Sequence, residues 1–279
     1  MTPTDVPTLL KNAENAFSKN NPELAFEFLE RAVSLDPSNP KALDGLAEGL
    51  LYLGNTAAAK SNFLKAAEVA PLSNIGRYMY LGQLSESHEA LQHYLTGIEA
   101  IGNQDLFEDE RNQMLCNAYV SIADLYLTDL CFEPNAESEC EKYLNLALQT
   151  STDNPDVFLT FCSFRLSQQR PDQAKEMLLK FDQLYALDPE QVTPMNKLNA
   201  AKFHFEVGNV GACLEYADVV LSSDDTNIDA LIVYATALHS DGDGEEAVEV
   251  VEKAKSVALM NGWNEVVADF DSLIERFKS

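Results

Sequence analysis

Residues 40–71 read PKALDGLAEGLLYLGNTAAAKSNFLKAAEVAP, and this stretch decides the fold. Small residues in it allow two antiparallel helices to approach closely, and large apolar residues fill the space between them. The small residues are Ala47, Ala59 and Ala66, and the large ones are Leu43, Leu46, Leu50 and Phe63. Such a helix pair cannot bury its apolar face alone, so it must stack against similar pairs.

The spacing of these residues resembles the tetratricopeptide-repeat consensus, in which every defining position except the first aromatic is filled acceptably. Proline, a large apolar residue and alanine also recur 34 residues apart, at Pro37 and Pro71, Leu29 and Phe63, and Ala32 and Ala66. The pattern predicts an all-α fold, a tetratricopeptide-repeat right-handed α-solenoid of about seven helix pairs plus a C-terminal capping helix.

The pattern can be followed along the whole chain. We place repeats near residues 6–39, 40–73, 71–102, 107–154, 155–189, 194–227 and 228–260. The fourth repeat carries about five extra residues between its helices, in the segment CFEPNAESE. Residues 262–278 predict the capping helix, on which we expect Trp263 to pack. We therefore expect residues 1–279 to form a single elongated solenoid domain.

Net charge is the most informative bulk property. The chain has 45 acidic and 19 basic residues, which gives a net charge of −26 without a poly-acidic tail. Acidic residues must then lie on folded surface, where they repel phosphates, so we expect no direct binding to nucleic acid. A basic partner is the natural complement, although acidity that only maintains solubility is the competing interpretation.

The sequence also bears on the compartment. No stretch reaches the roughly 18 continuous apolar residues of a membrane span, and the N-terminus has no secretory pattern. The five cysteines are odd in number and form no C-x-x-C pair, which is typical of reduced packing thiols. We expect no membrane association, and a protein that is cytoplasmic and nuclear.

We find no residue pattern that predicts catalysis or metal binding. His88 and His93 are five apart rather than on one helical face, and His204 and His239 stand alone. The run DGDGEE at 241–246 lacks the glycine and distal glutamate of a calcium loop and falls where the seventh repeat needs a turn. We expect no catalytic residue, no metal and no cofactor, which leaves an enzyme possible only through residues scattered in the sequence.

The candidate binding residues come from repeat geometry. In tetratricopeptide arrays, the first helix of each pair lines the inner surface, and the residues at those positions here are often acidic, with aromatic residues between them. The candidates are Glu14, Phe17, Asp44, Glu48, Tyr52, Asp124, Asp156, Phe205, Glu206 and Asp229. The competing interpretation is that carboxylates are common on any exposed helix face.

Three less common strings carry a narrower resemblance: RYMYLGQLSESHEALQHYLTGIEAI at 77–101, DLYLTDLCFEPNAESECEKYLNLAL at 124–148 and NPDVFLTFCSFRLSQQRPDQAKEML at 154–178. Together they resemble the fungal and plant family of dedicated assembly chaperones for large-subunit ribosomal protein four. The resemblance covers most of the chain. It implies a superhelix whose concave acidic face wraps the basic internal loop of that ribosomal protein, keeps it soluble and delivers it to the pre-60S ribosome. We expect a monomer that forms a one-to-one complex.

Three classes of function remain open at this point. They are a chaperone for a basic ribosomal protein, a scaffold subunit that bridges proteins in a larger complex, and an enzyme with dispersed residues. A scaffold usually presents mixed charge and apolar patches, whereas a net charge of −26 favours one basic partner.

Overall fold

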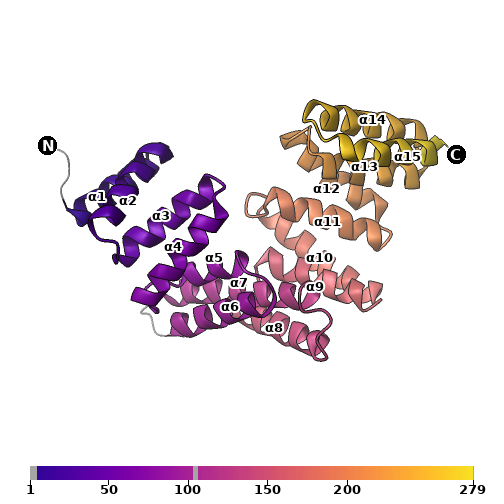
Figure 1. The fold of residues 1–279 in the computed structure, drawn as a ribbon. Helices are drawn as coiled ribbons and strands as arrows, with labels where there is room; N and C mark the ends of the chain where they lie inside the picture. The colour runs from indigo at the N-terminus through magenta and orange to yellow at the C-terminus, as the bar shows by residue number, and fades with distance from the viewer. Residues whose placement is uncertain (1–4, 103–105, 279) are drawn as a thin grey trace. The chain divides into compact units, whose positions relative to one another are not determined.

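The computed structural model describes residues 5–102 and 106–278. In this part of the chain the regular structure is entirely helical, as the sequence predicted (Figure 1). Contacts divide the helices into two compact units, Met1–Ser151 and Thr152–Ser279, and each is described by itself below. The single continuous domain stays a prediction. No described helix is both long and apolar enough to span a membrane.

The first unit contains four antiparallel helix pairs. Their bounds are α1 (Val6–Phe17), α2 (Pro22–Leu35), α3 (Pro40–Tyr52), α4 (Thr56–Val69), α5 (Gly76–Gln83), α6 (Ser87–Gly102), α7 (Glu108–Leu127) and α8 (Ala136–Thr150). Each pair packs closely within itself and against the next pair along the chain. These helices fall within the first four predicted repeats.

The second unit contains three helix pairs and a closing helix. Their bounds are α9 (Pro155–Ser167), α10 (Pro171–Leu187), α11 (Pro194–Glu206), α12 (Val210–Ser223), α13 (Ile228–Asp241), α14 (Gly244–Met260), the 3₁₀ turn η1 (Asn264–Val266) and α15 (Val267–Lys278). Among the first helices of these pairs, α11 contacts both α9 and α13. The predicted repeats five to seven and the capping helix are therefore present.

Asparagine starts many of these helices. Its side-chain oxygen accepts a hydrogen bond from a backbone N–H in the first turn, which would otherwise have no partner. The asparagines that do this are Asn21, Asn39, Asn55, Asn154, Asn209 and Asn227. Proline follows at the first helical position in α2, α3 and α9, where its missing N–H costs nothing.

Close approach between helices depends on small residues. Ala47 and Ala59 are fully buried in one cluster with Phe63, and Ala66 is fully buried as well, as the repeat pattern predicts. Gly82 of α5 lies so close to the ring of Tyr94 on α6 that an added Cβ would overlap it. The α5–α6 pair therefore requires glycine at this position.

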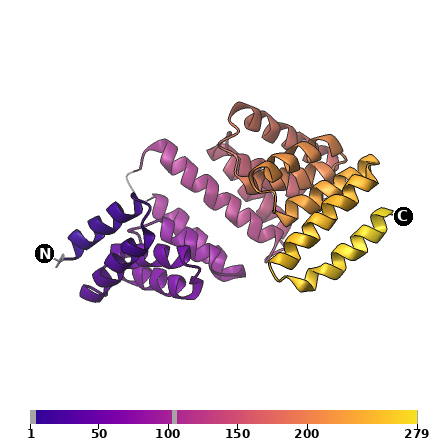
Figure 2. The same cartoon turned by 90° about the horizontal axis from the view of Figure 1, so that it is seen from above.

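The closing helix α15 lies along α14, as Figure 2 shows for the yellow helix at the C-terminus. Phe270, Ile274 and Phe277 are buried against α13 and α14, and Phe277 stacks on His239 with ring centroids 4.4 Å apart. The predicted capping helix is confirmed. Trp263 is 49% exposed, and its packing on the cap stays a prediction.

The long connection between α7 and α8 reaches back to the preceding repeat. Asp129 accepts a hydrogen bond of 2.9 Å from the backbone N–H of Ser87, the first residue of α6, and Glu133 lies 3.4 Å from His88. Leu130 is buried, whereas Phe132 is almost fully exposed. Asp129, which lies just before the extra residues of the fourth repeat, thus caps α6, and Glu133 within those residues lies near the same helix.

Candidate functional site

The acidic and aromatic candidates fall into one set in each unit. We call Glu14, Phe17, Glu48, Tyr52 and Asp124 the unit-1 acidic set, and Asp156, Phe205, Glu206 and Asp229 the unit-2 acidic set. All of these residues lie on the first helix of a pair, as predicted, and every acidic member is exposed. Asp44 is left out of the unit-1 set because it is buried.

Asp44 is buried, and the expectation that it lines an exposed face is wrong. Arg77 of α5 donates from Nε to Oδ1 and from Nη2 to Oδ2 of Asp44, both at 2.7 Å, and Asn74 adds a third bond of 2.9 Å. Arg77 is fully buried and Asp44 is 6% exposed. Because its carboxylate neutralises a buried guanidinium, Asp44 is not available to a partner.

The same arginine fixes the connection between α4 and α5. Its Nη1 donates to the carbonyl of Ala70 at 2.8 Å, and its Nη2 donates to the hydroxyl of Ser73 at 3.3 Å. Tyr78 donates to the carbonyl of Pro71 at 2.6 Å. Sequence reasoning missed this network, although the opposite charges of Asp44 and Arg77 are separated by about one repeat length.

The carboxyl of Glu48, a member of the unit-1 set, has a raised pKa. Partial desolvation by its neighbours raises the pKa of the Glu48 carboxyl, and the nearby charge of Asp44 raises it further. Glu48 also raises the pKa of the Tyr80 phenol, an effect smaller than that of burial, and Tyr80 stacks on Phe63 at 5.1 Å. The structure therefore adds Tyr80, which sequence reasoning missed, to the surroundings of Glu48.

The other members of the unit-1 set lie on helices α1, α3 and α7. Glu14 lies on α1, which contacts α3, the helix of Glu48. Phe17 is 41% exposed and Tyr52 is 72% exposed, so both rings can contact a bound chain. Asp124 lies on α7, close enough to Tyr94 of α6 to raise the pKa of its phenol, after the larger effect of burial.

The unit-2 acidic set is partly engaged within the protein. Asp156 accepts a hydrogen bond of 2.6 Å from Asn196, and Asp229 pairs with Lys202 at 3.2 Å. Phe205 is half-buried. Glu206 is exposed, and its charge, together with stronger desolvation, raises the pKa of the Cys162 thiol on α9 to about 12. Asp156, Glu206 and Asp229 thus lie on three helices in contact, but two of the three carboxylates already have protein partners.

His204 does not stand alone in the folded chain. It is buried, its Nε2 lies 3.1 Å from Oδ1 of Asp182, and Asn209 contacts its Nδ1 at 3.3 Å. Tyr216 donates to the same Asp182 oxygen at 2.8 Å. A histidine held by a carboxylate can activate a nucleophile, but the other side chains that contact the His204 ring are those of Asn209 and Tyr216, and neither is a serine or cysteine.

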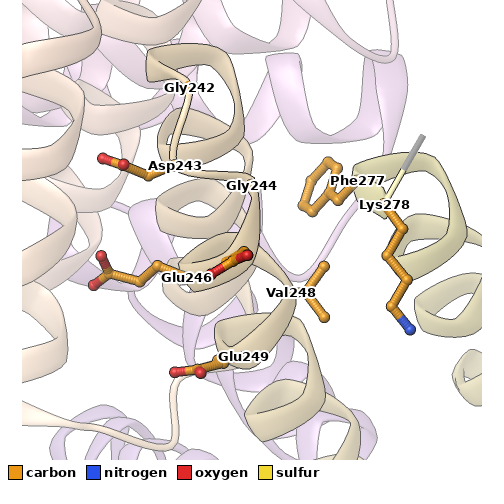
Figure 3. A pocket seen from close by; sticks show the side chains of 9 residues that line it. Gly242, Asp243, Gly244, Glu246, Val248, Glu249, Phe277 and Lys278 are labelled. Carbon is orange, nitrogen blue, oxygen red and sulfur yellow. The ribbon is translucent and has the colours of Figure 1, made fainter.

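The run at 241–246 forms a turn, as predicted. Helix α13 ends at Asp241, Gly242 adopts a positive φ of 103°, and α14 begins at Gly244. A hollow of about 1130 Å³ lies between this turn and the end of α15. Figure 3 shows Phe277 of α15 and Val248 of α14 on the sides by which these two helices face each other, while Asp243 and Glu249 extend away from α15. Its charged groups therefore do not converge on one point.

The five cysteines are free: Cys131 is exposed and the other four are buried. Burial raises the pKa of the Cys213 thiol to about 11, which makes it a poor nucleophile. Among the described residues, no group of three or more His, Cys, Asp or Glu side chains is placed to hold a metal ion.

Comparison with known proteins adds two curated relatives. No family model matches the chain. It is 34% identical over 148 residues to a Schizosaccharomyces pombe protein described as "Probable assembly chaperone of rpl4", an alignment that covers 50% of this chain and 44% of the relative. It is 27% identical over 222 residues to an Emericella nidulans protein of the same description, covering 74% of this chain and 56% of the relative. The chain thus spans about half the length of the curated relatives it matches.

Two solved structures are similar in fold to this chain. A structure of "Assembly Chaperone of RpL4 (Acl4)" superposes with a TM-score of 0.78 at 20% identity, covering 88% of this chain and all of that one. A tetratricopeptide repeat protein from Parabacteroides merdae gives a TM-score of 0.65 at 15% identity, covering 98% of this chain and 99% of that one. The fold is therefore an all-α tetratricopeptide-repeat solenoid, and the resemblance indicated by the sequence is confirmed.

Proposed function

We propose that this chain is a non-catalytic, dedicated chaperone of large-subunit ribosomal protein four. In this proposal, it binds the basic internal loop of the newly made protein, keeps it soluble and delivers it to the pre-60S ribosome. The observation that carries the proposal is the similarity to two curated proteins, both described as probable assembly chaperones of rpl4. The proposal includes a one-to-one complex that travels from cytoplasm to nucleus.

The charge of the chain supports this choice of partner. A segment rich in lysine and arginine is disordered before assembly and binds stray RNA, so a folded acidic surface competes for the same charges. The net charge of −26 and the exposed carboxylates of both acidic sets provide such a surface. Nucleic acid itself would be repelled by it.

Charge alone does not give tight binding. Exposed ion pairs contribute only about 0.2 to 1 kcal/mol each, whereas nanomolar affinity corresponds to about 12 kcal/mol. Apolar and aromatic contacts must supply the rest, and Phe17 and Tyr52 expose enough of their rings to do so. Phe205 is half-buried, so it offers less contact area.

The proposal is tested with purified proteins at matched ionic strength. The chain is titrated with ribosomal protein four, with a form that lacks the internal loop, and with another ribosomal protein of similar net charge. Tight binding only of the first supports the proposal. Equal binding of all three would show that the chain recognises charge rather than one protein, and would contradict it.

A purification from native extract separates the chaperone from the scaffold. Recovery of free ribosomal protein four with the chain agrees with the proposal. Recovery of a stable complex of several subunits without that protein would contradict the proposal and favour a bridging subunit.

A further inference from the structure

A small hollow lies between α10 and α12, the second helices of the fifth and sixth repeats. Its volume is about 320 Å³, and its lining consists of Asp182, Tyr185, Ala212, Glu215, Tyr216 and Val219. Two carboxylates, two phenol rings and two aliphatic side chains therefore share one opening. The unit-2 acidic set lies instead on the first helices of the repeats.

The aromatic wall of this hollow is fixed in place. The ring of Tyr216 stacks on His204 with centroids 5.5 Å apart, and it packs against Phe181 at 5.8 Å and Tyr185 at 5.1 Å. Tyr216 is 7% exposed, and burial followed by the contact with Asp182 raises the pKa of its phenol strongly. The phenol therefore stays neutral and keeps donating its hydrogen bond.

One carboxylate of the hollow is oriented before any ligand arrives. Oδ1 of Asp182 accepts the bond from Tyr216 and faces Nε2 of His204, at 2.8 Å and 3.1 Å. Oδ2 accepts no bond from any residue in the described part of the chain, and the Asp182 side chain is 34% exposed. A carboxylate held in this way loses little conformational entropy when it binds a cation.

The surrounding charges favour a cation. Asp182 and the exposed Glu215 lie at the opening, and both act electrostatically on Tyr216. Lys197 of α11 has its Nζ 5.5 Å from the centroid of the Tyr185 ring. The Tyr185 ring is therefore placed where a cationic group can lie against it.

We propose that the hollow between α10 and α12 binds a single arginine side chain from the basic segment of the partner, as an anchor outside the two acidic sets. The aliphatic side chains of Ala212 and Val219 contact the methylene stem, the ring of Tyr185 stacks on the guanidinium, and Asp182 and Glu215 accept its N–H groups. Arginine suits this site better than lysine because its planar guanidinium stacks on aromatic rings and donates to two oxygens at once. The identity of the partner rests on the proposed function, whereas the pocket does not.

The pocket is tested on the full chain with ring-labelled tyrosine and three small probes: N-acetyl-arginine amide, its lysine analogue, and its citrulline analogue, which is neutral and nearly the same shape. The ring signals of Tyr185 and Tyr216 shift saturably with the arginine probe, less with lysine and not with citrulline. Equal shifts with citrulline, or equal shifts of Tyr52, which belongs to the first unit and does not line the hollow, would overturn the proposal.

Two substitutions and a matched control complete the test. Tyr185→Leu weakens binding of the arginine probe about fivefold, and Glu215→Gln weakens it about threefold. Glu176→Gln removes an exposed carboxylate from the same helix α10 and leaves binding unchanged. An equal loss with Glu176→Gln would overturn the proposal. Glu215 is exposed, so its substitution is informative even if Tyr185→Leu fails to fold.

The partner is then tested with ribosomal protein four. If the pocket is its anchor, Glu215→Gln raises the dissociation constant of the complex about threefold and Glu176→Gln does not. Unchanged affinity of Glu215→Gln for ribosomal protein four, although the same variant binds the arginine probe about threefold more weakly, overturns the anchor role. Failure of the wild-type chain to bind ribosomal protein four would instead count against the proposed function, so the two failures are distinguishable.

Discussion

At the scale of single residues, a carboxylate at a position that usually faces a bound partner can instead stabilise the fold. Asp44 occupies a consensus position that faces the inner surface, yet it forms a two-bond ion pair with the fully buried Arg77. The guanidinium also holds the chain between α4 and α5 through Ala70. Removing either partner leaves the other charge buried and unpaired, which is far more costly than losing an exposed pair.

We therefore predict that Arg77→Ala lowers the free energy of unfolding by about 3 to 5 kcal/mol. The matched control is Lys60→Ala, which breaks the more exposed pair with Glu89 and costs at most about 1 kcal/mol. Urea denaturation of both variants measures the difference. Similar losses in the two variants would show that the Asp44–Arg77 pair contributes no more than a surface contact.

The acidity of Glu48 leads to a second prediction. Its pKa is raised in the folded protein, mainly by desolvation and further by Asp44, so the folded state binds a proton more tightly than the unfolded state. Its ionised form therefore destabilises the protein above the folded pKa, and this destabilisation disappears below the unfolded pKa. We predict that Glu48→Gln stabilises the protein at pH 7 and not at pH 3.

The measurement for Glu48 compares denaturation midpoints of the wild type and Glu48→Gln at each pH. Glu27→Gln, at an exposed position on α2, serves as the control and changes neither midpoint. A gain for Glu48→Gln that is the same at pH 3 and pH 7 would contradict the electrostatic explanation.

At the scale of helices, the long α7–α8 connection stabilises an element that is distant in sequence. Asp129 caps α6 of the preceding pair by accepting the Ser87 N–H, and Ser87 itself has a positive φ of 51°. Asp129 in the string TDLCFEPNAESE thus connects neighbouring repeats, and the extra residues that follow it bring Glu133 to 3.4 Å from His88.

We predict that Asp129→Ala lowers the free energy of unfolding by about 1 kcal/mol, the usual cost of losing a helix cap. Phe132→Ala changes the same connection at a side chain that is 96% exposed, and stability should not change. Thermal or urea denaturation of the first unit reports both. A larger loss for Phe132→Ala than for Asp129→Ala would contradict this interpretation.

The helices of this fold could be predicted because repeat packing constrains them locally. Alanines at fixed spacing and the 34-residue period place the first two helix pairs, and the same pattern of small and large apolar residues, followed along the chain, places the later ones. What could not be predicted depends on side chains that meet across repeats. The Asp44–Arg77 pair and the hollow around Tyr216 arise from contacts between helices that no single-helix pattern encodes. The same holds for the 49% exposure of Trp263, which depends on what the rest of the fold leaves uncovered.

For the candidate site, too, the helix face of a residue could be predicted, whereas its side-chain partners could not. Repeat position correctly placed Glu14, Glu48 and Asp124 on first helices with exposed side chains, because helical periodicity determines which face a residue occupies. It could not show that Asp156 and Asp229 already have partners in Asn196 and Lys202. Binding by either acidic set stays a prediction.

At the scale of the whole molecule, the excess of acidic residues is too large to be neutralised internally. With 45 acidic and 19 basic residues, most carboxylates have no basic side chain with which to pair. Several basic residues are already used, since Lys60, Arg77, Lys142, Lys202, Lys253 and Lys255 form ion pairs. The remaining negative field attracts a basic partner and accelerates its capture.

We predict that reversing Glu14, Glu48 and Asp124 to lysine slows association with ribosomal protein four more than reversing Glu27, Glu30 and Glu68 to lysine. Both triples change the net charge from −26 by the same amount, but the second lies at exposed positions on the second helices α2 and α4. Stopped-flow association rates at two salt concentrations measure the effect. The wild-type rate should fall as salt rises, because the Debye length shrinks from about 10 Å at 0.1 M to about 3 Å at 1 M. Thermal melts control for folding, and equal slowing by both triples would show that net charge, rather than the unit-1 acidic set, governs capture.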